Sequence, residues 1–185
     1  MRYFLVDVEA WGPSPVSGQM TEFGVVEFES RAWFHGVIYD AKPSEDNPAC
    51  PDPTTAKYDP HYGLVDYAGI AYESGPLLEK DVFKGLSRWL EQWDGPYRMV
   101  SDNPAYDYMW LAAGFDSNDR ENPFGHTARR IGDLYAGFAG KWKDTTSWKR
   151  WRQTPHTHNP VDDAMCNAEA LQAILDRYTT CEGSC

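Results

Sequence analysis

The sequence contains 185 residues, 42% of them hydrophobic, which is enough chain and apolar content for one domain with its own core. Its formal net charge of −11 argues against a general nucleic-acid coat protein, because such proteins need an excess of lysine and arginine to attract phosphate. The same charge does not exclude an enzyme that recruits divalent cations to a carboxylate cluster. No apolar run reaches the ~18 residues that a membrane-spanning helix requires.

The four cysteines form neither a CxxC pair nor a dense disulfide framework. This pattern favours a reduced, cytoplasmic setting. We expect residues 1–180 to form a single domain and residues 181–185, which include two of the cysteines, to form a flexible tail.

The first half of the chain predicts strands followed by a long loop. Residues 3–8 are rich in β-branched and aromatic types, as expected of a buried strand. Residues 21–30 and 31–40 predict two further strands, joined closely enough to form a hairpin. Residues 41–76 contain six prolines, and because proline interrupts helices and central strands, we expect a loop excursion there.

The second half alternates helices with short strands. Apolar residues at helical spacing predict a helix over residues 77–93, and a short strand is expected over 97–101. A second helix is predicted to begin near Pro104, a strand to lie around Arg130–Leu134, and a last helix to run from Pro160 to Tyr178. This order predicts an α/β or α+β fold with one mixed β-sheet flanked by α-helices.

Two acidic residues share one face of the first strand. Side chains two apart in a strand point the same way, so Asp7 and Glu9 project together while Val6 and Val8 occupy the other face. Two carboxylates on a core strand are costly unless a cation joins them. The alternative is that the strand ends by Asp7 and water solvates both acids.

The pattern N-P-x-x-D occurs twice, in NPAYD from Asn103 and in NPVDD from Asn159. Asparagine is a favoured N-cap and proline a favoured first helical residue, so two helices are predicted to begin identically. Each places an aspartate, Asp107 or Asp163, at the fourth helical position, where the helix dipole favours an ionised carboxylate. A simple capped helix start is the alternative for either motif.

Helical phase separates Asp163 from its neighbour Asp162. Asp162 lies on a stripe with Cys166, Glu169 and Asp176, which is mostly polar and is predicted to face water. Asp163 shares a stripe with Ala170 and Ile174 and is predicted to face the core.

Three motifs in register resemble the DEDDh subgroup of the DnaQ-like 3′–5′ exonucleases. FLVDVEAWG is similar to the first motif of that family and SDNPAYD to its second. HNPVDDA, in which Asp163 follows His158 by five positions, is similar to its third. The resemblance spans nearly the whole chain except 41–76 and 139–155. Two positions depart from the pattern, since Trp11 stands where a small polar residue is common and Pro160 replaces a small residue.

The resemblance implies an RNase H-like fold and a metal-dependent exonuclease. By similarity, four carboxylates would hold two Mg²⁺ or Mn²⁺ ions, and His158 would be the general base; His156 is a competing candidate at the wrong interval. The implied metal ligands are Asp7, Glu9, Asp107 and Asp163. The implied substrates are 3′ ends of single-stranded RNA or DNA, released as nucleoside 5′-monophosphates. The alternatives are a catalytically silent RNase H-like binding or assembly module and an unrelated phosphate-ester hydrolase.

The segment 141–152, KWKDTTSWKRWR, is basic in an acidic protein and contains three tryptophans. Its cations Lys149, Arg150 and Arg152 are candidate substrate-binding residues, and its tryptophans offer stacking surfaces for unpaired bases. Packing, with tryptophans inward and cations outward, is an equal alternative. Trp11 and Asn103 complete the expected substrate-binding set, and a homodimer is compatible with all of these features.

Overall fold

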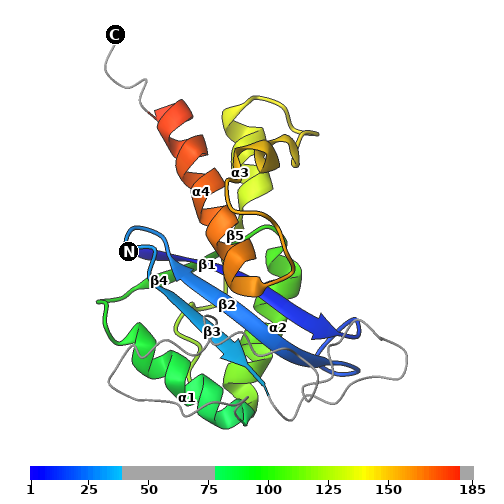
Figure 1. Cartoon of the computed structure of the whole chain (residues 1–185), viewed down its shortest axis with the longest axis vertical. Helices are drawn as coiled ribbons and strands as arrows, with labels where there is room; N and C mark the ends of the chain where they lie inside the picture. Colours follow the sequence, from blue (N-terminus) through cyan, green and yellow to red (C-terminus); the bar gives the residue numbers. More distant parts are fainter. Residues whose placement is uncertain (39–77, 180–185) are drawn as a thin grey trace.

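The computed structural model describes residues 1–38 and 78–179; the expected loop excursion at 41–76 and the expected tail at 181–185 lie outside these ranges. The described chain forms one five-stranded sheet in the order β3-β2-β1-β4-β5, with helices on both faces (Figure 1). The predicted mixed sheet flanked by helices is therefore confirmed. In the described ranges, no helix combines the length and apolar character needed to cross a bilayer.

The first three strands form an antiparallel meander. β1 (Arg2–Trp11) pairs with β2 (Gln19–Glu27), and β2 pairs with β3 (Trp33–Val37), which confirms the predicted hairpin. β1 is longer than the expected 3–8, so both Asp7 and Glu9 lie within the strand rather than beyond its end.

The other two strands are parallel and short. β4 (Tyr97–Ser101) pairs with β1 only along Arg2–Leu5, and β5 (Ala128–Arg130) pairs with β4. The strand predicted around Arg130–Leu134 is wrong, because helix α3 (Ile131–Phe138) begins directly after β5. Helical spacing decides this segment, since Ile131 and Tyr135, four apart, are both buried against α4 and η2.

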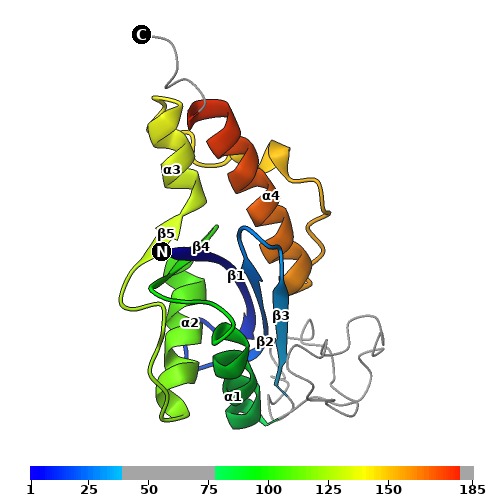
Figure 2. The same cartoon turned by 90° about the vertical axis from the view of Figure 1, so that its left-hand side faces the viewer.

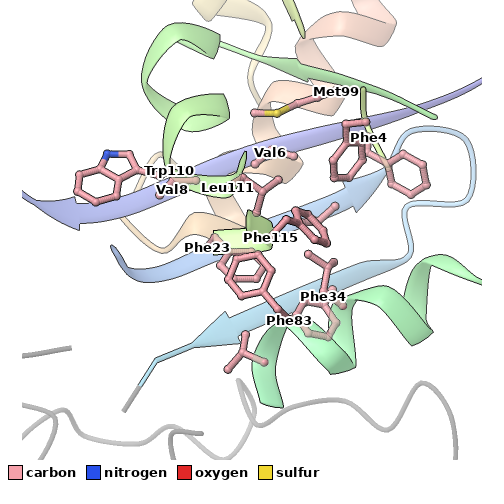
Figure 3. Close-up of a cluster of buried hydrophobic side chains, with 14 of the residues drawn as sticks. Phe4, Val6, Val8, Phe23, Phe34, Phe83, Met99, Trp110, Leu111 and Phe115 are labelled. Carbon is pink, nitrogen blue, oxygen red and sulfur yellow. The ribbon is translucent and has the colours of Figure 1, made fainter. Parts of the chain in front are cut away.

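One face of the sheet is covered by α1 (Glu79–Leu90) and α2 (Pro104–Ser117). Figure 2 shows both helices on the side of the sheet opposite α4. The core on this side is aromatic (Figure 3). Phe4 makes edge-to-face contacts with Trp89 and Tyr97 at centroid distances of 6.0 and 5.2 Å. Its buried residues include Phe4, Val6, Val8, Phe23, Phe34, Phe83, Met99, Trp110, Leu111 and Phe115.

The other face is covered by α4 (Pro160–Thr179), against which α3 and the short 3-10 helix η2 (Ser147–Trp151) pack. Small residues of α4 let the helix lie close to the strands. The buried residues here are Leu5, Val26, Val100, Ile131, Tyr135, Trp148, Ala164, Ala168, Ala170, Leu171 and Ile174.

Gly24 fixes where α4 begins on the sheet. It is the β2 partner of Asp7 in the strand register. A methyl group added at Gly24 would lie 2.2 Å from the carbonyl oxygen of Pro160 and 2.5 Å from the nitrogen of Val161. Since only glycine allows this approach, the first turn of α4 rests on the sheet directly beside Asp7.

We expect Gly24→Ala to lower the free energy of unfolding by about 1–3 kcal/mol, because main-chain atoms of α4 must move to admit the methyl group. Urea denaturation followed by circular dichroism measures the loss. The matched control is Gly137→Ala in α3, where a methyl group meets nothing within 4 Å and alanine favours the helix. Equal stability of the two variants would show that α4 does not depend on the contact with Gly24.

Candidate metal and nucleic-acid site

Asp7 and Glu9 project from the face of β1 that α4 covers. The side chains of β1 alternate between the two faces of the sheet here, because Val6 and Val8 are buried in the core on the opposite face. Both acids lie beyond Leu5, the last residue of β1 that pairs with β4. The two carboxylates therefore stand where β1 has lost its parallel neighbour.

Asp163 joins these two carboxylates from the first turn of α4. Its side chain is 1% exposed, and one oxygen accepts the N–H of Thr157 at 3.0 Å. Asp163, Asp7 and Glu9 can each offer an oxygen such that all three lie within 4.8 Å of one another. The predicted core-facing stripe of Asp163, Ala170 and Ile174 is buried throughout.

Asp107 approaches from the other side of the sheet edge, on the first turn of α2. One of its oxygens accepts the N–H of Val8 at 3.2 Å, and the other accepts the hydroxyl of Ser101. The N–H of Val8 is free for this bond because β4 has already ended. Asp107 thus takes the place of a strand neighbour at the open edge of β1.

The two N-P-x-x-D helix starts are not identical, contrary to the prediction. The side chain of Asn159 caps α4 by accepting the N–H groups of Val161 at 2.9 Å and Asp162 at 3.3 Å. The side chain of Asn103 makes no capping bond; its main-chain carbonyl accepts the N–H groups of Tyr106 and Asp107 instead. The exposed amide of Asn103 therefore stays open to solvent beside the site.

The stripe through Asp162 and Cys166 does not face water along its length, so that prediction is wrong. Cys166 is fully buried, and its thiol donates to the carbonyl of Asp163 at 3.2 Å. The reason is that the chain after η2 folds over this side of α4: Glu169 accepts the N–H groups of Gln153 and Thr154. Asp162 is half-buried, and its carboxylate accepts the hydroxyl of Thr157 at 3.1 Å.

Burial raises the pKa of three of the acids, Asp7, Glu9 and Asp107. Burial raises the pKa of Asp7 from 3.8 to about 9, and the charges of Asp107, Asp163 and Glu9 add to the rise. Burial likewise raises the pKa of Asp107 to about 7, against the lowering effect of its bonds from Ser101 and Val8. Burial also raises the pKa of Glu9, which His158 opposes. Without a bound cation, Asp7 therefore holds its proton at neutral pH.

Two histidines reach the cluster from the loop before α4. His156 is 46% exposed, and its Nδ1 contacts the carboxylate of Asp163. His158 is 80% exposed, and its Nδ1 lies 3.7 Å from Oε1 of Glu9. Their rings are 4.9 Å apart, so the sequence interval that favours His158 does not separate the two in space.

Arg152 is a buried cation beside the acids rather than a surface contact. Its side chain is 11% exposed, and its guanidinium donates to Asn167 at 2.6 Å and to Asp102 at 3.3 Å. The guanidinium also lies 4.9 Å from the ring centroid of Trp148. Its positive charge opposes the rise in the pKa of Asp7.

The other expected substrate-binding residues lie in two places. Lys149 pairs with Asp102 at 2.5 Å, and exposed Arg150 lies 4.7 Å from the ring centroid of Trp151. Trp11 ends β1, two residues after Glu9, and is half-buried. Trp11 therefore follows Glu9 on the same strand, and Asn103 precedes Asp107 by one helical turn. Lys149 and Arg152 are engaged in ion pairs with Asp102.

Comparison with known proteins identifies the fold. No protein-family profile matches the sequence, and no curated protein matches it. The structure is similar to the crystallographic structure of the nuclease domain of 3′hExo, a DEDDh family member, bound to rAMP. The TM-score is 0.63 at 15% sequence identity, over 96% of this chain and 93% of that one. The chain therefore has the RNase H-like fold, as predicted.

The donor set of the site fits a hard divalent cation. Carboxylate oxygens are the ligands that Mg²⁺ and Mn²⁺ prefer, and the three clustered acids repel one another in the absence of positive charge. Asp107 lies beside them and contributes to the raised pKa of Asp7. These four acids are the residues that would hold such ions.

Sequence patterns did not reveal three residues that shape the site. Ser101 binds Asp107, Asp102 anchors two cations, and Gly24 admits α4. A signal existed for Gly24, since glycine within a strand often marks the close approach of another backbone. Ser101 and Asp102 directly precede the N-P-x-x-D motif but carry no signature of their own.

We expect the metal-free protein to lose stability as pH rises from about 5 to 9. The folded state holds protons on Asp7 and Asp107 that the unfolded chain has already released, so folding becomes less favourable across this window. Melting temperatures measured in chelator should fall by several degrees, and Mn²⁺ should restore them most at high pH. Asp7→Asn should flatten the fall and remove most of the Mn²⁺ effect. A melting temperature that rises over this range would contradict the assignment.

Proposed function

We propose that this protein is a metal-dependent 3′–5′ exonuclease that acts on single-stranded RNA or DNA and releases nucleoside 5′-monophosphates. The observation that supports this most is the meeting of Asp7, Glu9 and Asp163 within 4.8 Å, with Asp107 beside them, on an RNase H-like fold. Three separate elements, β1, α2 and α4, supply these acids, so the cluster is not the by-product of one acidic segment.

The four carboxylates have the task of holding cations against the end of a nucleic-acid strand. When bound, two Mg²⁺ or Mn²⁺ ions would supply the positive charge that stabilises an in-line displacement at phosphorus. The carboxylates are positioned for this before any substrate arrives, because main-chain and side-chain donors orient Asp107 and Asp163.

His158 is proposed as the group that takes a proton from the attacking water. It is exposed to solvent and faces the cluster beside Glu9, and imidazole exchanges protons near neutral pH. His156 has a different role in this scheme, since its contact with buried Asp163 holds that carboxylate in place.

Trp11 and Asn103 are proposed to grip the terminal nucleotide. The structurally similar nuclease domain of 3′hExo was solved bound to rAMP, which supports a nucleotide as a ligand of this fold. Trp11 offers an indole near the end of β1, and the uncapped amide of Asn103 offers hydrogen bonds to a base or sugar.

The direct test is digestion of end-labelled single-stranded RNA and DNA, side by side, with Mg²⁺ or Mn²⁺. We expect mononucleotides to be released from the 3′ end and chelator to stop their release. Asp163→Asn should abolish turnover, whereas Asp162→Asn should retain most of it. The neighbouring residue is a matched control, because Asp162 bonds to Thr157 and not to the cluster.

Two outcomes would overturn the proposal. Release from the 5′ end or internal cleavage would contradict the polarity. Binding of oligonucleotides without any metal-dependent cleavage would identify the chain as a catalytically silent binding module instead.

We expect His158→Ala to keep Mn²⁺ binding and to lose about 10²–10⁴-fold in kcat, the usual contribution of a general base. The four carboxylates, not this imidazole, balance the cation charge, so calorimetry should give an unchanged affinity for Mn²⁺. Part of the lost rate should return at high pH, where hydroxide replaces the base.

The matched variant is His156→Ala, for which we expect a smaller loss without recovery at high pH, because this ring orients Asp163. Full activity of His158→Ala together with an inactive His156→Ala would transfer the role of base to His156. Loss of Mn²⁺ binding in His158→Ala would instead make His158 a metal ligand.

A further inference from the structure

Trp142 is exposed although the other two tryptophans of its segment have structural contacts. Its side chain is 85% exposed, whereas Trp148 is fully buried and donates its indole N–H to Thr145 at 2.9 Å. Trp151 packs edge-to-face on Tyr135 at 5.5 Å. A single exposed hydrophobic side chain is common on protein surfaces, so the residues around Trp142 decide whether it forms a contact site.

The turn that presents Trp142 is held in place by its main chain. The N–H of Lys141 donates to Ala136 at 2.9 Å, and that of Asp144 donates to Lys141 at 2.8 Å. Asp144 in turn accepts the N–H of Ser147 at 3.1 Å. The indole is therefore presented by an ordered turn and would lose little conformational entropy on binding.

The surroundings of Trp142 are basic. Lys141 and Lys143 flank it and are both exposed, and exposed Arg150 follows in η2. The whole chain has a net charge of −11, so this turn is a local reversal of sign. An aromatic face between cations is complementary to single-stranded nucleic acid, whose bases stack and whose phosphates are negative.

The turn also connects to the acidic site. From Trp142 the chain passes through η2, whose Lys149 and the following Arg152 both bind Asp102 beside α2. It then continues to His156 and His158 at the cluster. Figure 1 shows η2 and the orange loop descending along α4 toward the start of that helix.

We propose that Trp142, with Lys141 and Lys143, is a distal contact for the single-stranded nucleic acid whose 3′ end occupies the acidic site. This inference rests on the proposed nuclease function and adds a dependence on substrate length. Tyr178 is fifteen residues beyond Asp163 in α4, which corresponds to roughly 22 Å, and it stacks on Phe138 just before the turn. Stacked nucleotides rise by about 3.4 Å, so only strands longer than about six nucleotides would reach Trp142.

The test compares a trinucleotide with an oligonucleotide of about 20 residues, in cleavage and in binding by fluorescence anisotropy with Ca²⁺ in place of Mg²⁺. Trp142→Ala should raise the KM and Kd of the long strand by about tenfold, leave kcat unchanged, and leave the trinucleotide unaffected. Trp142→Phe should recover most of the affinity. An equal effect on both lengths, or no effect on either, would overturn the inference.

Charge is tested separately with Lys141→Gln/Lys143→Gln. This variant should reduce the slope of log Kd against log salt by about 1.4 for the long strand, as expected for two lost phosphate contacts. The matched control is Lys80→Gln/Lys84→Gln on α1, which removes the same charge from the opposite face of the sheet. If the control variant changes the salt slope by the same amount, the effect is due to the net charge of the protein, and this result would contradict a local contact at Lys141 and Lys143.

These measurements separate the inference from the proposed function. If the long strand binds strongly and through Trp142 but is not cleaved, the result supports the contact at Trp142 and rejects the exonuclease function. Cleavage with the same KM in the wild type and in Trp142→Ala would support the exonuclease function and reject the contact at Trp142. The other possible partner of Trp142 is a second copy of the chain. Light scattering measures the oligomeric state of the wild type and of Trp142→Ala. A dimer that dissociates only in the variant would show that Trp142 contacts a second copy, and it would overturn the inference.

Discussion

The repulsion among buried carboxylates is the constraint on which the rest of this structure depends. Three of them share a space of less than 5 Å, and burial together with their mutual charge raises the pKa of Asp7 to about 9. Such a cluster is unfavourable by itself, so favourable packing in the rest of the protein must offset the free-energy cost of keeping the acids together. The aromatic core on the far face of the sheet, beneath Val6 and Val8, provides a rigid support for the strand that carries two of them.

The cluster exists because β4 stops short of the end of β1 and because β2 has a glycine opposite Asp7. β4 leaves β1 after Leu5, and this frees the N–H of Val8 for Asp107. On the other side β2 continues, but its residue opposite Asp7 is Gly24, over which the first turn of α4 can lie. A full-length β4 would displace Asp107, and a side chain at Gly24 would displace Asp163. The geometry of the site is thus a consequence of strand length and of one missing side chain.

Local patterns were sufficient to predict the strand that carries Asp7 and Glu9 and the phase that turns Asp163 inward, because both depend on simple periodicity. They failed at Arg130–Leu134, where so short a segment suits either a strand or a helix and only the packing against α4 decides. They also failed for Cys166, whose burial depends on a loop from elsewhere in the chain. The difference between Asn103 and Asn159 has the same origin, since identical motifs meet different surroundings.

Arg152 is a cation with a structural task within the protein rather than at its surface. Its guanidinium donates to Asn167 and Asp102 and lies over the ring of Trp148, so these contacts hold it beside the acids. From there it partly offsets the charge of Asp7. It also joins the end of η2 to the loop that precedes α2, which fixes the start of the histidine-bearing loop relative to Asp107. The same side chain therefore limits the repulsion of the acids and sets the position from which His156 and His158 approach them.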